Sequence, residues 1–398
     1  MEKKKPEIRF NGFEGEWAPY AFRFLFTEKR DTTQDEFEDQ LLSCAIDGIY
    51  LNSELFNHFR GSTTIGYLKV KRYDLILSAQ NLHLGNANVN LRFASGIISP
   101  AYKVYTINGD DPYFINAWVK SEHAKNFFMS ATTEGASLCR KNIEWEFLYD
   151  KKICIPSLSE QEKIGVFLTT LDKLIAKLEA KLDKLRKLKQ ALLEKMFVNI
   201  NRGYETPEIR FKGYTNKWEV NNVASIFETY YDKNHPNLPV LSATQEFGMV
   251  IRNNVGFQVQ HNKENEVGYK RVLPGQFVIH LRSFQGGFAH SMVEGITSPA
   301  YTVMQFKKST KQDDIYWKYV LTSKTFIKRL ETVTYGIRDG RSISFEDFSE
   351  LDFTYPSLSE QEQIGKCFTQ IDTHFSKTST KLTKLRNIKQ SLLQKMFA

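Results

Sequence analysis

Four short clusters in this chain hold side chains that could hydrogen-bond to the edges of nucleic acid bases. Arginine and lysine suit guanine, asparagine and glutamine suit adenine, and serine hydroxyls suit several bases. The candidates are Ser78, Gln80 and Asn81; Ser137, Arg140 and Lys141; His280, Arg282, Ser283 and Gln285; and Tyr335, Arg338, Arg341 and Ser342. An ordinary polar loop is the alternative for any one residue, so the prediction rests on the clusters.

Residues that could catalyse a reaction show no comparable pattern. Asp111-Pro112-Tyr113 lacks the second proline of the base pocket of an amino-methyltransferase, so we interpret it as a turn. No phosphate-binding GxxxxGK[ST] loop occurs, and His280 and His290 have no cysteine or carboxylate at the spacing of metal ligands. We therefore predict a chain that is not an enzyme and holds no metal and no cofactor.

Composition narrows the class of protein without deciding it. The chain has 398 residues, a formal net charge of +8 and 13% aromatic residues, a balance that suits a polyanionic partner but does not prove one. No run of about 18 apolar residues is present, and the basic start has no apolar stretch behind it. The four cysteines form no CxxC pair. These features predict a cytoplasmic protein without a membrane segment.

The elements that must position the clusters come from an internal repeat. Residues 156–197 and 356–397 are identical at 24 of 42 positions, including Pro-Ser-Leu-Ser-Glu-Gln-Glu at the start and Lys-Met-Phe at the end. A lead-in segment, Pro6 to Trp17, returns as Pro207 to Trp218, and Ser-Pro-Ala-Tyr occurs at 99–102 and 298–301. The stretches between these blocks have diverged. The sequence therefore predicts two similar units with different contents.

Both repeated blocks predict a long helix. Apolar residues recur at steps of three and four, a stripe that also passes through Leu188 and Ile388. Ser159-x-x-Glu162 and Ser359-x-x-Glu362 predict a capping box at each start. Because both helices carry the same stripe, we expect them to pair as an antiparallel coiled coil, although each could lie on its own domain instead. The predicted pairing residues are Ile164, Leu171, Leu178, Leu182, Leu185, Leu192, Ile364, Ile371, Leu382, Leu385 and Leu392.

The predicted organisation is α+β: two similar mixed α/β domains separated by two long antiparallel helices, with an internal pseudo-twofold repeat. We expect a lead-in segment and first domain at 1–155, a first helix at 156–199, a second lead-in and domain at 200–355, and a second helix at 356–398. Residues 74–77 and 276–280 predict strands. Basic residues line the second helix after Asp372, including Lys377, Lys381 and Lys384, which indicates a solvated flank or a face near phosphate or an acidic partner.

The SLSEQExIG helix start, the terminal KMF, the PEIRFxGxxxxW lead-in, the SPAY element and the two divergent domains together resemble the specificity subunit of a type I restriction-modification enzyme. The resemblance covers the whole chain, but the domain interiors carry little of it. It implies two target recognition domains, each contacting one half of an asymmetric, bipartite sequence in double-stranded DNA. It also implies that the helices set the half-site spacing and dock two methyltransferase (modification) subunits.

What the resemblance implies for cofactors concerns the partners. S-adenosylmethionine would be bound by the modification subunits, and ATP and Mg²⁺ by motor (restriction) subunits of the full complex. The alternative function is a coiled-coil scaffold that joins two protein-binding domains without contacting DNA, and it predicts no salt-sensitive DNA affinity.

Overall fold

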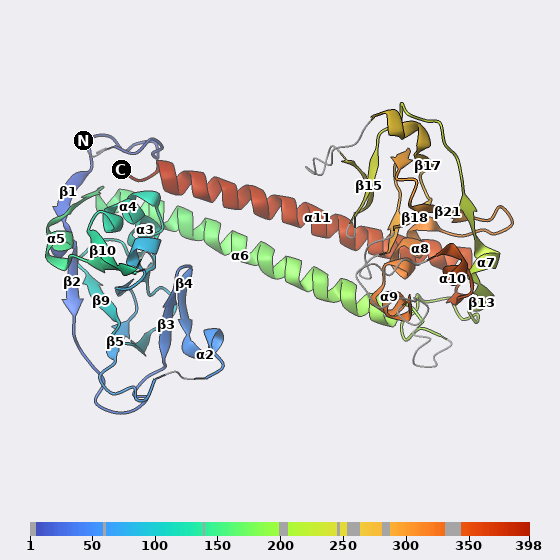
Figure 1. Ribbon diagram of the computed structural model, residues 1–398. Coiled ribbons are helices and arrows are strands. Elements are labelled where there is room, and N and C mark those ends of the chain that lie inside the picture. Colours follow the sequence, from blue (N-terminus) through green and yellow to red (C-terminus); the bar gives the residue numbers. More distant parts are fainter. Residues whose placement is uncertain are drawn as a thin grey trace. The chain divides into compact units, whose positions relative to one another are not determined.

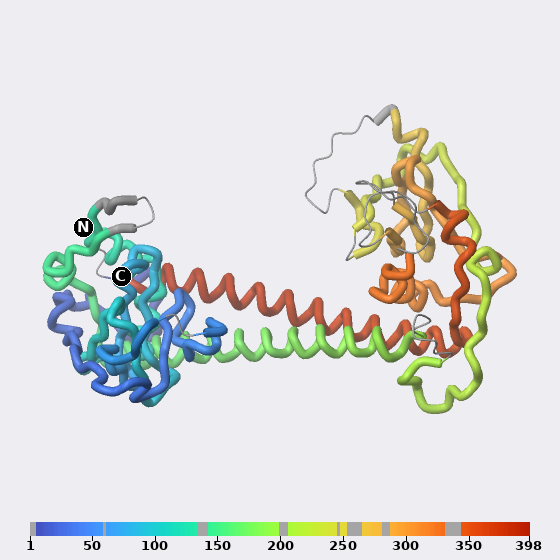
Figure 2. The backbone as a smooth tube through the Cα atoms, turned by 60° about the horizontal axis from the view of Figure 1, so that its bottom comes forward, coloured from blue at the N-terminus to red at the C-terminus, as the bar shows by residue number. Residues whose placement is uncertain are grey.

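A computed structural model of the chain describes residues 5–58, 61–137, 140–198, 206–244, 247–252, 263–280, 287–330 and 344–398 (Figures 1 and 2). The chain divides into two compact units: residues 1–180 with 379–398, and residues 181–378. The two long helices, α6 (Leu158–Lys195) and α11 (Leu358–Lys395), each run through both units as one uninterrupted helix. Each unit therefore combines one mixed domain with part of both helices.

Most strands and short helices described in the first domain recur in the same order in the second. The first holds β1 (Ala18–Ala21), α1 (Phe22–Leu25), β2 (Phe26–Lys29), β3 (Leu42–Ala45), β4 (Gly48–Leu51), α2 (Asn52–Leu55), β5 (Leu68–Lys71), β6 (Leu75–Ser78), the 3₁₀ helix η1 (Leu82–Leu84), β7 (Ala87–Val89), β8 (Ser95–Ile98), β9 (Tyr102–Ile107), α3 (Pro112–Val119), α4 (Glu122–Met129), β10 (Thr132–Ser137), β11 (Arg140–Ile143), α5 (Trp145–Asp150) and β12 (Lys152–Ile155).

The second holds β13 (Glu219–Asn222), α7 (Val223–Ile226), β14 (Phe227–Tyr230), β15 (Leu241–Thr244), β16 (Gly248–Ile251), the 3₁₀ helix η4 (Lys263–Gly268), β17 (Lys270–Val272), β18 (Phe277–Ile279), β19 (Phe288–His290), β20 (Gly295–Thr297), β21 (Thr302–Phe306), α8 (Asp314–Leu321), α9 (Lys324–Leu330), α10 (Phe345–Ser349) and β22 (Asp352–Tyr355).

An antiparallel four-stranded sheet forms the centre of each domain. Its strand order is β2-β9-β6-β7 in the first domain and β14-β21-β18-β19 in the second, so the topology is the same. Two-stranded sheets pair β5 with β8 and β17 with β20, β3 with β4 and β15 with β16, and β1 with β12 and β13 with β22. The hairpin of β10 and β11 belongs to the first domain. The predicted α+β class with two similar domains is confirmed.

The central strands bury both faces, as their apolar runs require. Leu75 and Leu77 of β6 pack into one hydrophobic cluster and Ile76 into another on the opposite face of the sheet. In β18, Phe277 and Ile279 face one cluster and Val278 the other. This alternation follows from the two-residue period of a strand. The predicted strands 74–77 and 276–280 are thus confirmed, with slightly different bounds.

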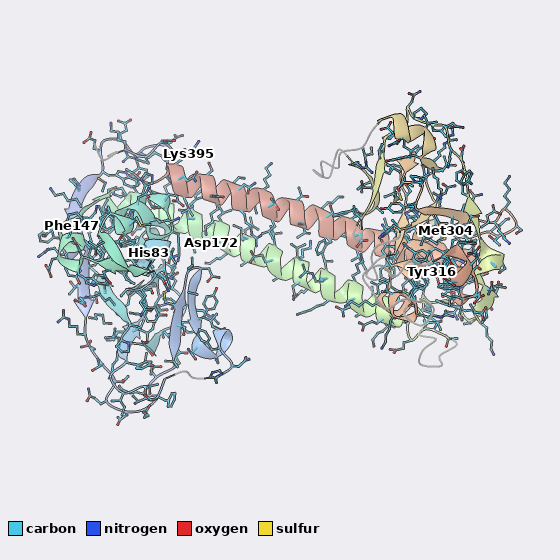
Figure 3. The ribbon with its side chains drawn as sticks, viewed as in Figure 1. His83, Phe147, Asp172, Met304, Tyr316 and Lys395 are labelled. Carbon is cyan, nitrogen blue, oxygen red and sulfur yellow. The ribbon has the colours of Figure 1, made fainter. Side chains whose placement is uncertain are left out.

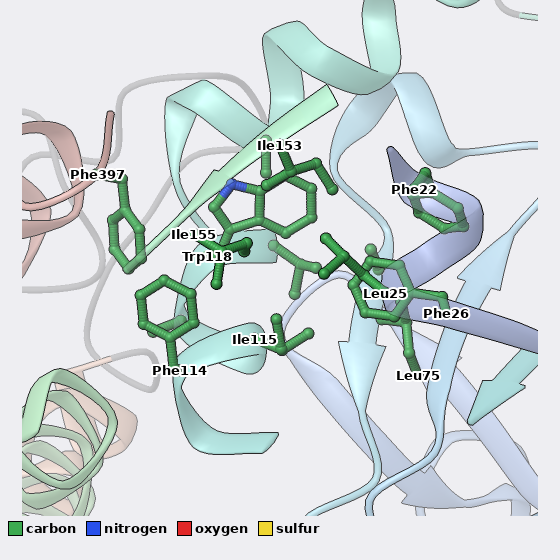
Figure 4. Close-up of a cluster of buried hydrophobic side chains, with 14 of the residues drawn as sticks. Phe22, Leu25, Phe26, Leu75, Phe114, Ile115, Trp118, Ile153, Ile155 and Phe397 are labelled. Atoms are coloured by element: carbon green, nitrogen blue, oxygen red, sulfur yellow. The ribbon is translucent and has the colours of Figure 1, made fainter. Parts of the chain in front are cut away.

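The larger cluster of each unit includes the far end of the helix that began in the other half of the sequence. Met396 and Phe397, at the end of α11, are each 2% exposed within the first domain's core. The Phe397 ring lies beside that of Phe114 (Figure 4), tilted, with 5.5 Å between the ring centres. The centre of the Trp17 ring lies 6.5 Å from that of Phe397, in an edge-on arrangement. In the second unit, Met196 is buried and Phe197 lies 5.6 Å from Tyr316. The repeated Lys-Met-Phe is therefore an anchor for the core.

Two sequence-based predictions about helix starts are wrong. The long helices begin at Leu158 and Leu358, so Ser159 and Ser359 lie inside the first turn and do not cap it. Instead the carbonyl of Ser157 accepts the N–H of Gln161, and that of Ser357 accepts the N–H of Gln361. Asp111-Pro112-Tyr113 is the start of α3 and not a turn, because Asp111 caps the N–H of Phe114 at 2.7 Å with Pro112 in the first helical position.

Candidate nucleic-acid interface

A buried ion pair fixes the start of each long helix to its lead-in segment. Arg9 donates two hydrogen bonds of 2.7 Å to the carboxylate of Glu160, whose side chain is 1% exposed. Arg210 makes the same two bonds to Glu360, at 2.9 and 2.7 Å. The hydrogen bond to Glu160 raises the pKa of Arg9, and Glu360 acts likewise on Arg210. Two-pronged arginine–carboxylate bonds restrict geometry, so they orient the helix.

The next two motif residues bring the long helix against a domain helix. Gln161 accepts the N–H of Asp111 at 2.9 Å and donates to the carbonyl of Pro156, and Gln361 repeats this with Asp313 and Pro356. Gly165 packs so closely on α3 that an added Cβ would lie 2.8 Å from the backbone nitrogen of Phe114. The repeated motif SLSEQExIG therefore joins each long helix to its own domain.

Within each unit the two long helices run antiparallel. In the first unit Glu179 accepts a hydrogen bond from Arg386 at 2.6 Å, and Asp172 pairs with Lys389. In the second, Asp372 pairs with Lys189 at 2.6 Å. Positions that rise along α6 thus meet positions that fall along α11, as Figure 1 shows, and Figure 3 labels Asp172 on α6. The predicted antiparallel coiled coil is confirmed.

The predicted pairing residues all lie on buried or half-buried positions, but they pack in two ways. Ile164 and Leu392 join the first domain's core, and Ile364, Ile371 and Leu192 join the second's. Leu382 is buried along the helix, and Leu171, Leu178, Leu182, Leu185 and Leu385 are half-buried there. The helix ends thus pack on a domain as well as on each other.

The stripe predicted through Leu188 and Ile388 is wrong at these two positions, which are 48% and 40% exposed. Alternating steps of four and three carry the seam from Leu185 to position 189 and from Leu385 to position 389. Lysine stands at both, half-buried, with its ammonium on an aspartate of the opposite helix. Simple apolar spacing missed these residues because a lysine stem can pack as an aliphatic chain.

The first predicted contact cluster lies in the loop between β6 and β7. Gln80 and Asn81 are exposed, whereas Ser78 is 6% exposed at the end of β6 and presents little surface. The loop is held down by buried Leu82 and His83, and the backbone N–H of Leu84 donates to Asn81. Gln80 and Asn81 are therefore displayed on a fixed loop. Their contact with bases stays a prediction.

The third predicted contact cluster begins at His280, directly after β18, the strand of the second domain that is equivalent to β6. His280 follows β18 and is half-buried, with its ring 6.1 Å from Tyr301. Arg282, Ser283 and Gln285 lie outside the described residues, as do Tyr335, Arg338, Arg341 and Ser342. Ser137, Arg140 and Lys141 belong to the hairpin of β10 and β11, whose register pairs Ser137 with Arg140. The structure describes only the backbone at these three positions.

A buried polar cluster that sequence reasoning missed positions the β3–β4 hairpin of the first domain. Lys120, which caps α3, donates to the carbonyls of Ile46 (2.6 Å) and Ala87 (2.8 Å) and to the side chain of Asn88. Asn88 also donates to Cys44 in β3. Burial lowers the pKa of Lys120 to about 8 and raises that of Cys44 to about 11. Neither helix propensity nor spacing could have predicted the contacts among these five residues.

The second domain holds its hairpin differently. The positions equivalent to Asn88 and Lys120, the middle of β19 and the C-cap of α8, are Ala289 and Thr322. There β16 approaches β19 closely, so that a Cβ on Gly248 would meet the carbonyl of His290. The imidazole of His290 is bonded to Asp314 at 2.7 Å, and His290 is thus a core residue. The two domains use different contacts to place the same hairpin.

The repeated SPAY element has a structural explanation. It forms the turn between β8 and β9 and between β20 and β21, in which the N–H of Tyr102 or Tyr301 donates to the carbonyl of the serine three residues earlier. The serine hydroxyl also accepts the N–H of the alanine, at 3.3 Å in both copies. SPAY therefore forms the turn that joins two strands in each domain.

Within the part of the chain that the structure describes, no group of three or more His, Cys, Asp or Glu side chains could hold a metal ion. No helix in the same described ranges is long and apolar enough to cross a membrane.

Sequence and structure comparisons relate this chain to one class of protein. No family model matches the chain. A Methanocaldococcus jannaschii protein described as the MjaX specificity subunit of a type I restriction enzyme is 23% identical over 336 residues, which cover 80% of this chain and 71% of that protein.

Two crystal structures are among the solved structures that the chain resembles. The type I restriction-modification S subunit of M. genitalium aligns with a TM-score of 0.60 at 13% identity, covering 99% of both chains. The HsdS subunit of Thermoanaerobacter tengcongensis aligns with a TM-score of 0.47 at 15% identity, covering 96% of both. The chain therefore shares the fold of a type I restriction-modification specificity subunit, and the resemblance predicted from its repeated motifs is confirmed.

Proposed function

We propose that this chain is the sequence-specific DNA-binding subunit of a type I restriction-modification complex, directing it to an asymmetric, bipartite target. Each domain contacts one half-site in the major groove. The paired helices fix the spacing of the half-sites and dock two modification subunits. The chain itself carries out no chemistry: its partners bind S-adenosylmethionine for methylation, and motor subunits bind ATP and Mg²⁺.

One observation carries this proposal. The two domains have the same strand order and are joined to the same repeated lead-in segments and long helices, which together we call the frame. Their equivalent loops nevertheless hold different residues. The loop after β6 offers Gln80 and Asn81, and the segment after β18 holds His280 and Arg282. Two unlike domains on like frames suit two unlike half-sites, whereas identical domains would suit a palindrome. The likeness to specificity subunits supports the same assignment.

The frame supports a positioning role for the helices. Buried ion pairs lock each helix start to its lead-in segment, and the terminal Lys-Met-Phe of each helix enters a domain core. A helix of 38 residues is roughly 57 Å long at about 1.5 Å per residue. Target sites one duplex turn apart, about 34 Å, fall within such a length.

The deciding experiment is to co-express the chain with its modification subunits and to map methylated adenines by single-molecule sequencing. We expect a split, asymmetric motif that requires the chain. Exchange of residues 18–155 for the equivalent segment of another specificity subunit is expected to change one half of the motif and leave the other. A stable complex that yields no motif would favour the scaffold function.

Salt dependence separates the same two functions in vitro. Lys381 and Lys384 are exposed on α11. If this face runs near DNA phosphate, the variant Lys381→Glu/Lys384→Glu lowers DNA affinity and reduces the slope of log affinity against log salt by about two. Unchanged salt dependence and unchanged assembly would remove this face from the interface.

A further inference from the structure

The β3–β4 hairpin of the first domain ends in an exposed apolar side chain. Ile46 and Asp47 form its two-residue tip, and Ile46 is 57% exposed. The equivalent hairpin of the second domain, β15–β16, has Phe247 in its tip, and this side chain is 67% exposed. Both domains thus present a large apolar side chain at the same place in the fold, and packing of the core does not account for either.

The tip of the first hairpin is held from below by hydrogen bonds to its backbone. The ammonium of Lys120 donates to the carbonyl of Ile46 at 2.6 Å, so the tip residue itself is fixed. The side-chain amide of Asn88 donates to the carbonyl of the preceding residue, Ala45, at 2.7 Å. These bonds fix the position of the Ile46 side chain without covering it.

The second hairpin is held by other contacts. The hydroxyl of Thr244 accepts the N–H of Phe247 at 3.1 Å and donates to the carbonyl of Gly248 at 2.8 Å. Gly248 packs so closely on β19 that an added Cβ would lie 2.2 Å from the carbonyl oxygen of His290. An exposed side chain on a fixed backbone is suited to recognition, because little conformational entropy is lost when it makes a contact.

Each hairpin lies beside a segment that holds predicted base contacts. In the first domain, Asn86, at the end of the loop between β6 and β7, donates to the carbonyl of Cys44 in β3 at 3.2 Å. Gln80 and Asn81 are exposed in that same loop. In the second domain, a backbone bridge joins β16 to the end of β19, the strand that follows the equivalent segment. The apolar tips are therefore neighbours of the polar contact clusters.

The chemistry of the tips suits a base and not a phosphate. Asp47 lies next to Ile46, and its carboxylate accepts the hydroxyl of Tyr50 at 2.9 Å. Glu246 precedes Phe247 in the sequence. A carboxylate repels DNA phosphate, which favours contact with the base edges in the groove. The apolar group that base edges present in the major groove is the C5 methyl of thymine, which apolar side chains such as phenylalanine contact.

We propose that Ile46 and Phe247 are specificity-determining residues, each contacting the C5 methyl group of a thymine in the half-site of its own domain. This inference rests on the function proposed above and names the group on DNA that each hairpin recognises. The two tips differ in residue type and in length, whereas the frame is the same in both copies. Different tips on a common frame suit thymines at different positions in two unlike half-sites.

Deoxyuridine supplies the test, because it pairs as thymidine does and lacks only the methyl group. The full chain is purified with the modification subunits that assemble with it, and the motif found by methylation mapping is placed in a duplex. Each thymine of the motif is replaced in turn, and affinity is measured by fluorescence anisotropy at one salt concentration. A half-site with a methylated adenine also holds its thymine partner. We expect one sensitive position in each half-site, where loss of the methyl group weakens binding about fourfold.

The variants assign each sensitive position to a domain. Ile46→Ser should abolish the sensitivity in one half-site and leave it in the other, and Phe247→Ser should do the reverse. Ile46→Val keeps an apolar tip and should retain both sensitive positions. Phe24→Ser is the matched control, because Phe24 is 69% exposed, lies in α1 and has serine at the equivalent position, Ser225. It should also retain both.

Two results would overturn this inference and leave the proposed function standing. One is an unmodified chain that binds its motif equally well with every deoxyuridine, and the other is a serine variant that keeps both sensitive positions. If such a variant also loses a modification subunit in native mass spectrometry, its tip contacts protein instead of DNA. A complex that yields no motif at all would overturn the proposed function as well.

Discussion

The frame that joins helix to domain and the interiors of the two domains differ in how far the copies agree. In the frame, Arg9–Glu160 and Arg210–Glu360 match bond for bond, and Gln161 matches Gln361. In the interiors, a turn that needs a positive φ is made by Tyr73 (φ 72°) in one domain and Gly275 (φ 84°) in the other. The shared residues are those that lock the scaffold, and the differing ones place its loops.

The largest difference we predict between the copies concerns the helix ends. Phe397 is fully buried, whereas Phe197 is half-buried. Phe397→Ala should lower the free energy of unfolding of the first unit by about 3–4 kcal/mol, and Phe197→Ala that of the second by about 1–2 kcal/mol. Hydrogen exchange measured by mass spectrometry reports on each unit separately. Equal losses would contradict the unequal burial.

The ion pairs test the similarity of the frame. Glu160→Ala and Glu360→Ala each leave a partly buried arginine without its carboxylate, at a cost of about 3 kcal/mol. Because the two sites have the same geometry, chemical denaturation should give equal losses for the two variants within about 0.5 kcal/mol. A clear inequality would show that the frames are not equivalent.

Gly165 and Gly365, which follow Glu160 and Glu360 in the repeated motif, test how closely the packing of the two copies agrees. A Cβ on Gly165 would lie 2.8 Å from the nitrogen of Phe114, and one on Gly365 3.2 Å from that of Tyr316. Gly165→Ala should therefore destabilise its unit by about 2 kcal/mol, and Gly365→Ala by less than about 1 kcal/mol because helix propensity offsets part of the crowding. Thermal unfolding of both variants decides whether this small difference in packing is real.

Buried Lys120 predicts a pH dependence of stability that arises in the first domain. Burial lowers the pKa of Lys120 from 10.5 to about 8, so between these values the unfolded chain binds more protons than the folded one. Lys120 therefore makes stability rise with pH above about 8, and the raised pKa of Cys44 opposes this rise above about 9. Lys120→Met should abolish this rise and cost about 1 kcal/mol at pH 7, because the carbonyls of Ile46 and Ala87 lose a donor.

Thr322→Met, at the equivalent position of the second domain, is the control for that measurement. It should leave the pH dependence as it is in the unmodified chain. Persistence of the rise in Lys120→Met would assign it to another group.

The sequence predicted the elements that have a period and missed those that depend on distant partners. The stripes and repeated motifs predicted α6 and α11 within two residues of their starts. The roles of Glu160, Gln161 and Gly165 could not be predicted, because each depends on Arg9, Asp111 or Phe114, which lie far away in the chain. The predicted capping boxes are wrong because the helices begin at Leu158 and Leu358, one residue before Ser159 and Ser359.

The candidate contacts were predicted by residue type alone. Type and loop position distinguish Gln80 and Asn81 from core residues, and the structure agrees that both are exposed. They do not reveal that Ser78 is buried, nor that Lys120, Asn88 and Cys44 support the neighbouring hairpin. Burial depends on which strands are neighbours in the sheet, and that order cannot be derived from local periodicity.

The packing of Met396 and Phe397 into the first domain has a consequence during synthesis on the ribosome. Residues 18–155 emerge long before these two side chains, so the first domain to be made is the last to complete its core. The second domain follows Met196 and Phe197, and it can close as soon as the start of α11 is available. Until translation reaches Phe397, the nascent first domain keeps an apolar opening around Trp17 and Phe114 that a chaperone could cover.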